Sequence, residues 1–176
     1  MDYVRSEDIP NIELYMDQVT SFMDEQLSSS KRYDDDKILT KTMINNYAKN
    51  NLLPPPVKKK YSKEHVIVMI FIYYFKTILS IKDIETILTP ITEKYFGTDS
   101  AVDVASIYEE VCDTAKSQIQ NLKDEVREAY ETSQNTFKDM EGLSDSDREY
   151  LQLFSLISSL SFDVYAKKAL IERIID

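Results

Sequence analysis

The sequence predicts a mainly α-helical protein, with a compact helical head at 1–92 and a hairpin of long helices at 93–176. Only two of its 176 residues are glycine and five are proline, three of them consecutive. No stretch alternates β-branched with polar residues for long, which disfavours strands. Apolar residues instead recur at three- and four-residue spacing, as on the buried face of a helix. The length allows one core, or a head with a helical appendage.

Charge is distributed unevenly along the chain. The formal net charge is −10, which by itself argues against a nucleic-acid-binding protein. Between Lys37 and Lys63, however, there are seven lysines and no acidic residue, so this segment carries +7 and the remainder −17. An acidic body with one basic face is typical of a protein that binds nucleic acid locally. The alternative is an ordinary solvated surface.

Several classes of protein are not expected. No uncharged stretch, the apolar 66–75 included, approaches the roughly 20 residues that span a bilayer, and no signal peptide is apparent, so we expect a cytoplasmic protein without a membrane partner. The single cysteine, Cys112, excludes an internal disulfide and a multi-cysteine metal site. No catalytic motif accompanies His65, and two glycines cannot form a phosphate-binding loop. We expect no enzyme, no metal and no cofactor.

The N-terminal part predicts a packing helix that is capped by Asn11 and runs to about Leu27, and its apolar residues, Ile12 included, follow one helical face. A polar loop at 28–36 follows it. Its three adjacent aspartates cannot converge on a metal ion, because they are consecutive.

The next helix, capped by Thr40 and running over about 41–50, is the candidate recognition helix. Met43, Ile44 and Tyr47 lie inward at helical spacing. The outer face carries Lys41, Thr42, Asn45, Asn46 and Lys49. Asparagine is a poor helix former, whereas its amide can bond adenine in the major groove, and Lys and Thr can contact phosphates. An ordinary polar helix surface is the alternative.

Proline then ends that helix and begins a short wing. Residues 54–56 lack backbone N–H donors and force the chain to be extended. The excursion at 57–61 that follows carries Lys58, Lys59 and Lys60. Ser62 caps the next helix.

Two further helices complete the predicted head. The segment from His65 to Leu79 is apolar on nearly every side, so it is expected to be the central core helix. Ser80, with Asp83 three residues on, predicts the cap of a short helix that ends at Leu88.

These motifs carry a resemblance. The segment TKTMINNYAKNNLLPP, from Thr40 to Pro55, resembles the recognition helix of MerR-type winged helix-turn-helix regulators. The residues YSKE from Tyr61 resemble the entry to their third helix, and LSIKDIETIL from Leu79 resembles their fourth. The whole block, with LYMDQV from Leu14, is more similar still to a bacterial family, domain of unknown function 1836, regarded as MerR-like. The resemblance covers roughly residues 9–115.

The resemblance implies a DNA-binding head, with some departures. The Arg-Tyr-Tyr of the family's recognition helix is Asn45, Asn46 and Tyr47 here, the wing is shorter, and a long loop at 28–36 replaces a tight turn. By position, the implied DNA contacts are Lys41, Thr42, Asn45, Asn46 and Lys49 in the helix and Lys58, Lys59 and Lys60 in the wing.

The C-terminal half predicts a helical hairpin. A helix over about 101–137 has a heptad seam from Ala101 to Ala129, and Ser144 with Asp147 predicts the cap of a last helix that is apolar on several faces. MerR-type proteins dimerise through a helix in this position. We therefore expect a homodimer through the C-terminal helices, with Ile119 and Leu122 protected from solvent.

Two functions of different class remain open. The first is a DNA-binding transcriptional regulator whose partner is double-stranded DNA, with an unknown small-molecule effector. The second is a protein-interaction module, in which the helix-turn-helix no longer binds DNA and the acidic hairpin binds another protein. The segregated lysines favour the first, and the missing arginines and short wing favour the second.

Overall fold

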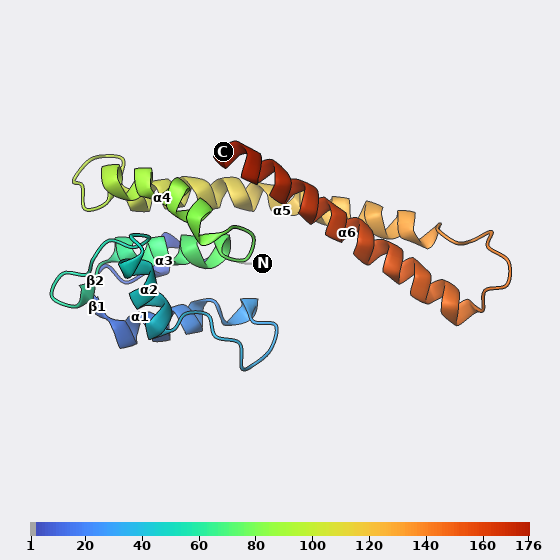
Figure 1. Cartoon of the computed structure of the whole chain (residues 1–176), viewed down its shortest axis with the longest axis horizontal. Helices are drawn as coiled ribbons and strands as arrows, with labels where there is room; N and C mark the ends of the chain where they lie inside the picture. Colours follow the sequence, from blue (N-terminus) through green and yellow to red (C-terminus); the bar gives the residue numbers. More distant parts are fainter. Residues whose placement is uncertain (1–2) are drawn as a thin grey trace. The chain divides into compact units, whose positions relative to one another are not determined.

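The computed structural model describes residues 3–176, apart from the side chain of Gln120, and confirms a mainly α-helical fold (Figure 1). The described residues form α1 (Met16–Gln26), α2 (Lys41–Lys49), α3 (Lys63–Phe75), α4 (Ile81–Tyr95), α5 (Val104–Gln134) and α6 (Asp145–Ile175). A two-stranded antiparallel sheet pairs β1 (Leu14–Tyr15) with β2 (Lys60–Tyr61), and short 3₁₀ turns occupy Ser6–Asp8 and Ser28–Ser30. In this described part of the chain, no helix combines the length and apolar character needed to cross a membrane.

The chain divides into two compact units. Unit 1 runs to Asp113, and unit 2 comprises Thr114 to Ile174. The division falls inside α5, whereas the sequence placed the domain boundary between residues 92 and 93. The reason is that Val104 and Tyr108, in the first turns of α5, are buried in unit 1.

Helix α3 forms the core of unit 1. Its residues 65–72 are all buried, as expected for a helix that is apolar on nearly every side. Phe71 stacks against Phe75, with ring centroids 5.7 Å apart, and meets the Tyr108 ring of α5 edge-on at 5.4 Å. Helix α4 and strand β2 also pack on α3. The central helix predicted from the sequence is therefore confirmed, although it ends at Phe75 and not at Leu79.

Four of the five predicted helix caps are confirmed, and the exception is Asn11, because α1 begins only at Met16. Thr40, Ser62, Ser80 and Ser144 each accept a hydrogen bond from the backbone N–H three residues on. Each bond satisfies one of the N–H groups that a helix leaves free in its first turn. The starts of α2, α3, α4 and α6 are thus fixed by local sequence.

The predicted first helix was wrong at its start. The helix begins at Met16, and Ile12 is 65% exposed where the sequence predicted burial. The preceding residues are extended because Leu14 pairs with Tyr61 and Tyr15 with Lys60 across the sheet. Gln18 then bonds the backbone N–H of Tyr15 at 2.8 Å, which closes the first turn of α1.

The fourth helix was predicted to end at Leu88, but α4 continues through Pro90 to Tyr95. Proline removes one backbone donor from a helix interior. Pro90 lies on the exposed side of α4, where water can bond the freed carbonyl. The hydroxyl of Thr92 donates to the Leu88 and Thr89 carbonyls, at 3.2 and 3.1 Å, which holds the following turn.

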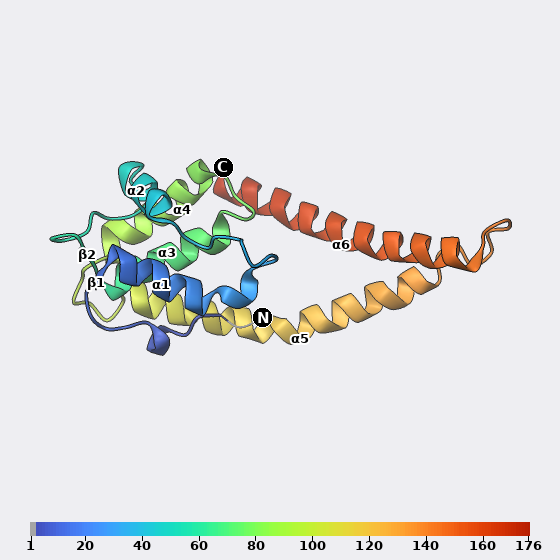
Figure 2. The same ribbon diagram turned by 90° about the horizontal axis from the view of Figure 1, so that it is seen from below.

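In unit 2, α5 and α6 run antiparallel, joined by the turn at 135–144 (Figure 2). Arg148 of α6 donates to the carbonyls of Phe137, Lys138 and Met140, which ties the turn to the helix. The sequence predicted an apolar seam that starts at Ala101. Ala101 lies outside α5, which begins at Val104, so the seam starts one turn later than predicted. Leu122 remains 50% exposed within the single chain.

The substitution Phe71→Ala should lower the free energy of unfolding by about 3–5 kcal/mol, because it opens a cavity beside the α3 core. Urea unfolding followed by circular dichroism measures the change. The matched control is Tyr33→Ala, since that aromatic is 58% exposed in the same unit and should change stability by less than about 0.5 kcal/mol. A loss below about 1 kcal/mol for Phe71→Ala would contradict the central place of α3.

Candidate nucleic-acid interface

Helix α2 presents the polar face that the sequence predicted. Ile44 and Tyr47 are buried, while the opposite face is open to solvent. All five candidate residues of this helix are exposed: Lys41, Thr42, Asn45, Asn46 and Lys49. The helix therefore offers two amides, a hydroxyl and two ammonium groups on one uncovered face.

Helix α2 ends before the prolines to which its end was attributed. Asn51 adopts a left-handed conformation with φ of 56°. The N–H of Leu52 then bonds the Tyr47 carbonyl at 2.9 Å, and the N–H of Asn51 bonds the Ala48 carbonyl at 3.3 Å. These two bonds are the Schellman motif, which satisfies carbonyls at a helix end. The buried Leu52 and its neighbour Leu53 then anchor the exit from α2.

The wing is a two-residue hairpin. Val57 and Lys60 exchange both backbone hydrogen bonds, at 3.1 and 2.9 Å. Lys58 and Lys59 occupy the turn, with φ values of 50° and 65°. Two positive φ angles define a type I′ turn, which usually carries Asn-Gly and not two lysines. Both lysines are exposed, so the turn places two positive charges at its tip.

One short segment, Glu13 to Asp17, joins α2 to the wing. Asp17, in the first turn of α1, forms an ion pair with Lys41 of α2. Glu13 forms another with Lys60, at 3.3 Å, and the Lys60 ammonium lies 5.7 Å from the centre of the Tyr15 ring. Lys41 and Lys60, which are distant in sequence, therefore flank the same few residues. The sequence did not predict these partners, because the contacts that create the two ion pairs, β1 with β2 and α1 with α2, are non-local.

These ion pairs are easily exchanged. Asp17 and Lys41 have side chains 75% and 59% exposed, and exposed pairs contribute about 0–1 kcal/mol each. A phosphate group can therefore replace either carboxylate at little cost. The same carboxylates, when no phosphate is present, repel other anions from this surface.

His65 supports the base of the wing. Its ring is buried, and Nδ1 accepts a hydrogen bond from the Ser62 backbone N–H at 3.0 Å, which leaves Nε2–H to donate to the Pro55 carbonyl at 3.4 Å. Tyr61 and Phe96 pack edge-on against the ring. Burial lowers the pKa of His65 from its ordinary value of 6.5. The neutral imidazole thus links the strand after the turn to the proline segment before it.

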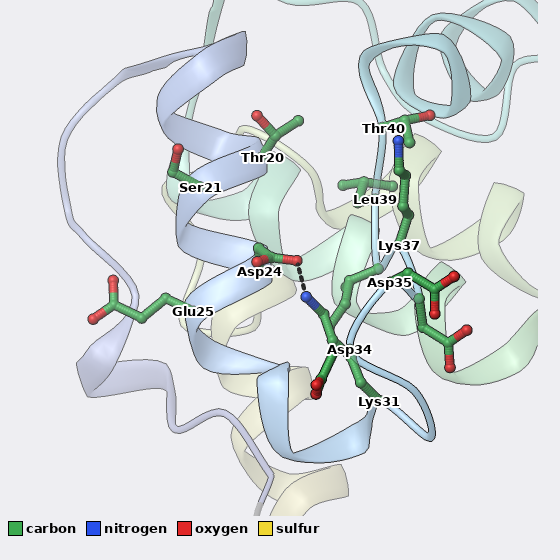
Figure 3. Close-up of a pocket in the computed structure, with 12 residues that line it drawn as sticks. Thr20, Ser21, Asp24, Glu25, Lys31, Asp34, Asp35, Lys37, Leu39 and Thr40 are labelled. Carbon is green, nitrogen blue, oxygen red and sulfur yellow. Dashed lines mark ion pairs between the residues drawn. The ribbon is translucent and has the colours of Figure 1, made fainter.

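A separate cavity of about 650 Å³ lies between α1 and the loop before α2 (Figure 3). Its wall contains a 2.7 Å ion pair between Lys31 and Asp24 (Figure 3), and the aspartates at 34–36 also line it. Asp36 accepts hydrogen bonds from the N–H groups of Arg32 and Tyr33, so its carboxylate shapes the loop. Among the residues placed in the structure, no group of three or more His, Cys, Asp or Glu side chains is arranged to hold a metal ion.

Comparisons with known proteins give one match. A family model described as "Domain of unknown function (DUF1836)" matches residues 4–111. No curated protein matches the chain. No solved structure matches it either.

His65 should make the stability of unit 1 depend on pH. Folding lowers the pKa of His65, so the imidazole binds a proton more readily in the unfolded chain than in the folded one. The contribution of the neutral His65 to the free energy of unfolding is therefore complete above about pH 6.5 and is lost as the pH falls below that value. His65→Gln keeps a hydrogen-bond acceptor but cannot titrate. Urea midpoints measured at about pH 7 and about pH 5 should fall less in this variant than in the wild type. An equal fall in both proteins would contradict the assignment.

Proposed function

We propose that this chain, which belongs to the DUF1836 family, is a cytoplasmic transcriptional regulator that binds double-stranded DNA through a MerR-like winged helix-turn-helix head. One observation carries the proposal: Glu13 and Asp17, four residues apart, contact lysines of both α2 and the wing. The two basic elements therefore lie beside the same short segment, whose strand β1 pairs with β2 at the base of the wing. No catalytic step is part of the proposal.

In this proposal, α2 enters the major groove. An α-helix with its side chains is about 10–12 Å across, and the major groove is about 12 Å wide. Asn45 and Asn46, in the middle of the exposed face, are placed to read base edges, and an amide bonds adenine through two hydrogen bonds. Lys41, Thr42 and Lys49 flank them and bind phosphates, which fix the helix in register.

The wing contacts the phosphate backbone beside the helix. Lys58 and Lys59, at the tip of the type I′ turn, supply two charges. Lys60 supplies a third by exchanging Glu13 for a phosphate. Glu13 and Asp17 oppose non-specific association. A phosphate that displaces one of these carboxylates gains little binding free energy until α2 also contacts the bases. Binding should therefore be weak on random DNA.

A homodimer through the C-terminal helices is part of the same proposal. Two heads on a two-fold axis read two half-sites, which raises specificity. The C-terminal helices leave apolar side chains uncovered in the single chain, among them Leu122 of α5, 50% exposed, and Phe154 of α6, 57% exposed, and a second chain can cover such apolar surface.

The exposed apolar side chains of α6 favour a second candidate, an interaction module without DNA binding. Phe154, Phe162 and Tyr165 are each more than half exposed. Large exposed apolar surfaces mark protein-binding sites. Here the acidic hairpin would bind another protein, and the lysines of the head would be an ordinary surface.

Removal of the two turn charges should weaken binding to every DNA sequence. Lys58→Asn with Lys59→Gly keeps the type I′ turn, because Asn-Gly is its preferred pair. The slope of log affinity against log salt should flatten by about 0.9 for each phosphate that the wing no longer neutralises. Fluorescence anisotropy titrations over a range of salt concentrations measure it.

The control removes equal charge elsewhere, at Lys123 and Lys138 of unit 2, which are both exposed. This variant, Lys123→Gln with Lys138→Gln, should keep the wild-type slope. An unchanged slope in the Lys58 and Lys59 variant would rule out the wing as a phosphate-binding element.

Asn45→Ala should relax sequence preference while leaving the salt slope nearly intact. The loss should be about 1–3 kcal/mol at one base position, which is the contribution of a bidentate base contact. Selection of bound fragments from genomic DNA, repeated with the variant, reports the preference position by position. If the wild type enriches no palindromic sequence, the interaction module becomes the better candidate.

A further inference from the structure

We propose that the outward face of α6 is the dimerisation surface and that α6 of a second copy packs on it antiparallel. The face consists of Tyr150, Phe154, Ile157, Ser161 and Val164. These residues recur at alternating four- and three-residue spacing, which is the a/d seam of a coiled coil. This inference rests on the homodimer proposed above and not on DNA binding.

The face is uncovered within one chain. Tyr150, Phe154, Ile157 and Val164 are 68%, 57%, 54% and 58% exposed. Ser161, the one polar residue of the seam, donates its hydroxyl to the Ile157 carbonyl at 2.7 Å. Its donor is therefore satisfied within the helix, and the residue can be buried in an apolar seam at small cost.

The side of α6 that faces α5 includes polar groups. Gln152 is buried there, and its amide donates to the Gln134 and Thr136 carbonyls at 2.9 and 3.2 Å. Lys167 lies between Asp163, at 2.8 Å, and Glu125 of α5, at 3.8 Å. The polar contacts with α5 leave the apolar residues of the outward face uncovered, and an exposed apolar helix face of this kind marks a site for a second partner.

Charge along α6 identifies that partner as a second copy of the chain. The first turn carries Asp145 and Asp147, and the last third carries Lys167 and Lys168. Asp147 and Lys168 continue the seam at its two ends, one heptad before Phe154 and one after Ser161. An antiparallel pair brings each acidic end to the basic end of its partner. A parallel pair would place like charges together and align the helix dipoles.

The ion pair that Lys168 makes with Glu172 of its own chain, at 2.6 Å, does not oppose this arrangement. Both side chains are about 40% exposed, so the ammonium can also reach an acid across the seam. The seam between Asp147 and Lys168 is three heptads long, or roughly 30 Å. That length is sufficient for a sustained helix–helix contact.

The test uses the full-length chain and sedimentation equilibrium without DNA. The wild type should be a dimer at micromolar concentration. Phe154→Glu with Ile157→Glu should raise the dissociation constant roughly a hundredfold or more, because each dimer then buries four carboxylates in the seam. Circular dichroism should show unchanged helix content, since both side chains are exposed in the single chain.

The matched control is Phe162→Glu with Leu170→Glu. It changes the same kinds of residue by the same charge, at positions 71% and 59% exposed that lie outside the seam, and it should remain dimeric. A monomeric wild type, or a dimer that survives the Phe154 and Ile157 substitutions, would overturn the inference. If the wild-type protein is a dimer but does not bind DNA, the proposed function is contradicted and the α6 dimer surface is not.

Orientation is tested with spin labels in a Cys112→Ser background. Labels placed singly at Tyr150 and at Lys168 should give distances between the two copies that average roughly 30 Å in an antiparallel pair, against roughly 10 Å in a parallel one. Long distances support the antiparallel seam. Short distances at both positions would overturn it.

Discussion

Burial of one helix on all its sides is the constraint on which the head depends. Residues 65–72 of α3 leave no face for solvent, so every neighbouring element must contribute apolar side chains to cover it. Helix α2 needs only Ile44 and Tyr47 on its inner side to join this arrangement. Its exposed side chains do not pack against this core. A surface rich in lysine and asparagine can therefore be carried by a rigid core without weakening it.

The sequence predicted those features whose causes are local. Four helix starts were predicted because a Ser or Thr side chain can accept a hydrogen bond from the backbone N–H three residues on. The eight candidate interface residues were predicted from helical phase and charge. Seven of them are exposed, and Lys60 is half-buried. Non-local features were missed. The extended Leu14 and Tyr15 depend on Tyr61 and Lys60. The continuation of α4 through Pro90 was missed for a different reason, because proline usually ends a helix. The carboxylates of Glu13 and Asp17 join the interface only once that sheet has formed.

The strongly negative body and the basic surface act together. Under the proposed function, a protein with a net charge of −10 would repel DNA at a distance and attract it only within a Debye length of the lysines, about 8–10 Å at physiological salt. Glu13 and Asp17 sharpen the effect, because they occupy the lysines until a phosphate displaces them. For the proposed regulator, such an arrangement would lower affinity for DNA and improve discrimination between an operator and other DNA. Unit 2 meanwhile keeps its acids away from the head's lysines in sequence and carries its own apolar surface on α6.

The small sheet also affects the order in which the chain can fold during synthesis. Strand β1 is made early, but β2, its partner, follows only after α1 and α2 have been made. Until Lys60 and Tyr61 leave the ribosome, the backbone of Leu14 and Tyr15 has no strand to pair with, and α1 has no buried α3 on which to pack. Unit 2, in contrast, is a hairpin of adjacent helices with short-range contacts, which form fast. The head is therefore expected to fold slowly during synthesis, with its strand backbone and apolar side chains exposed, and a chaperone would protect the chain most at this stage.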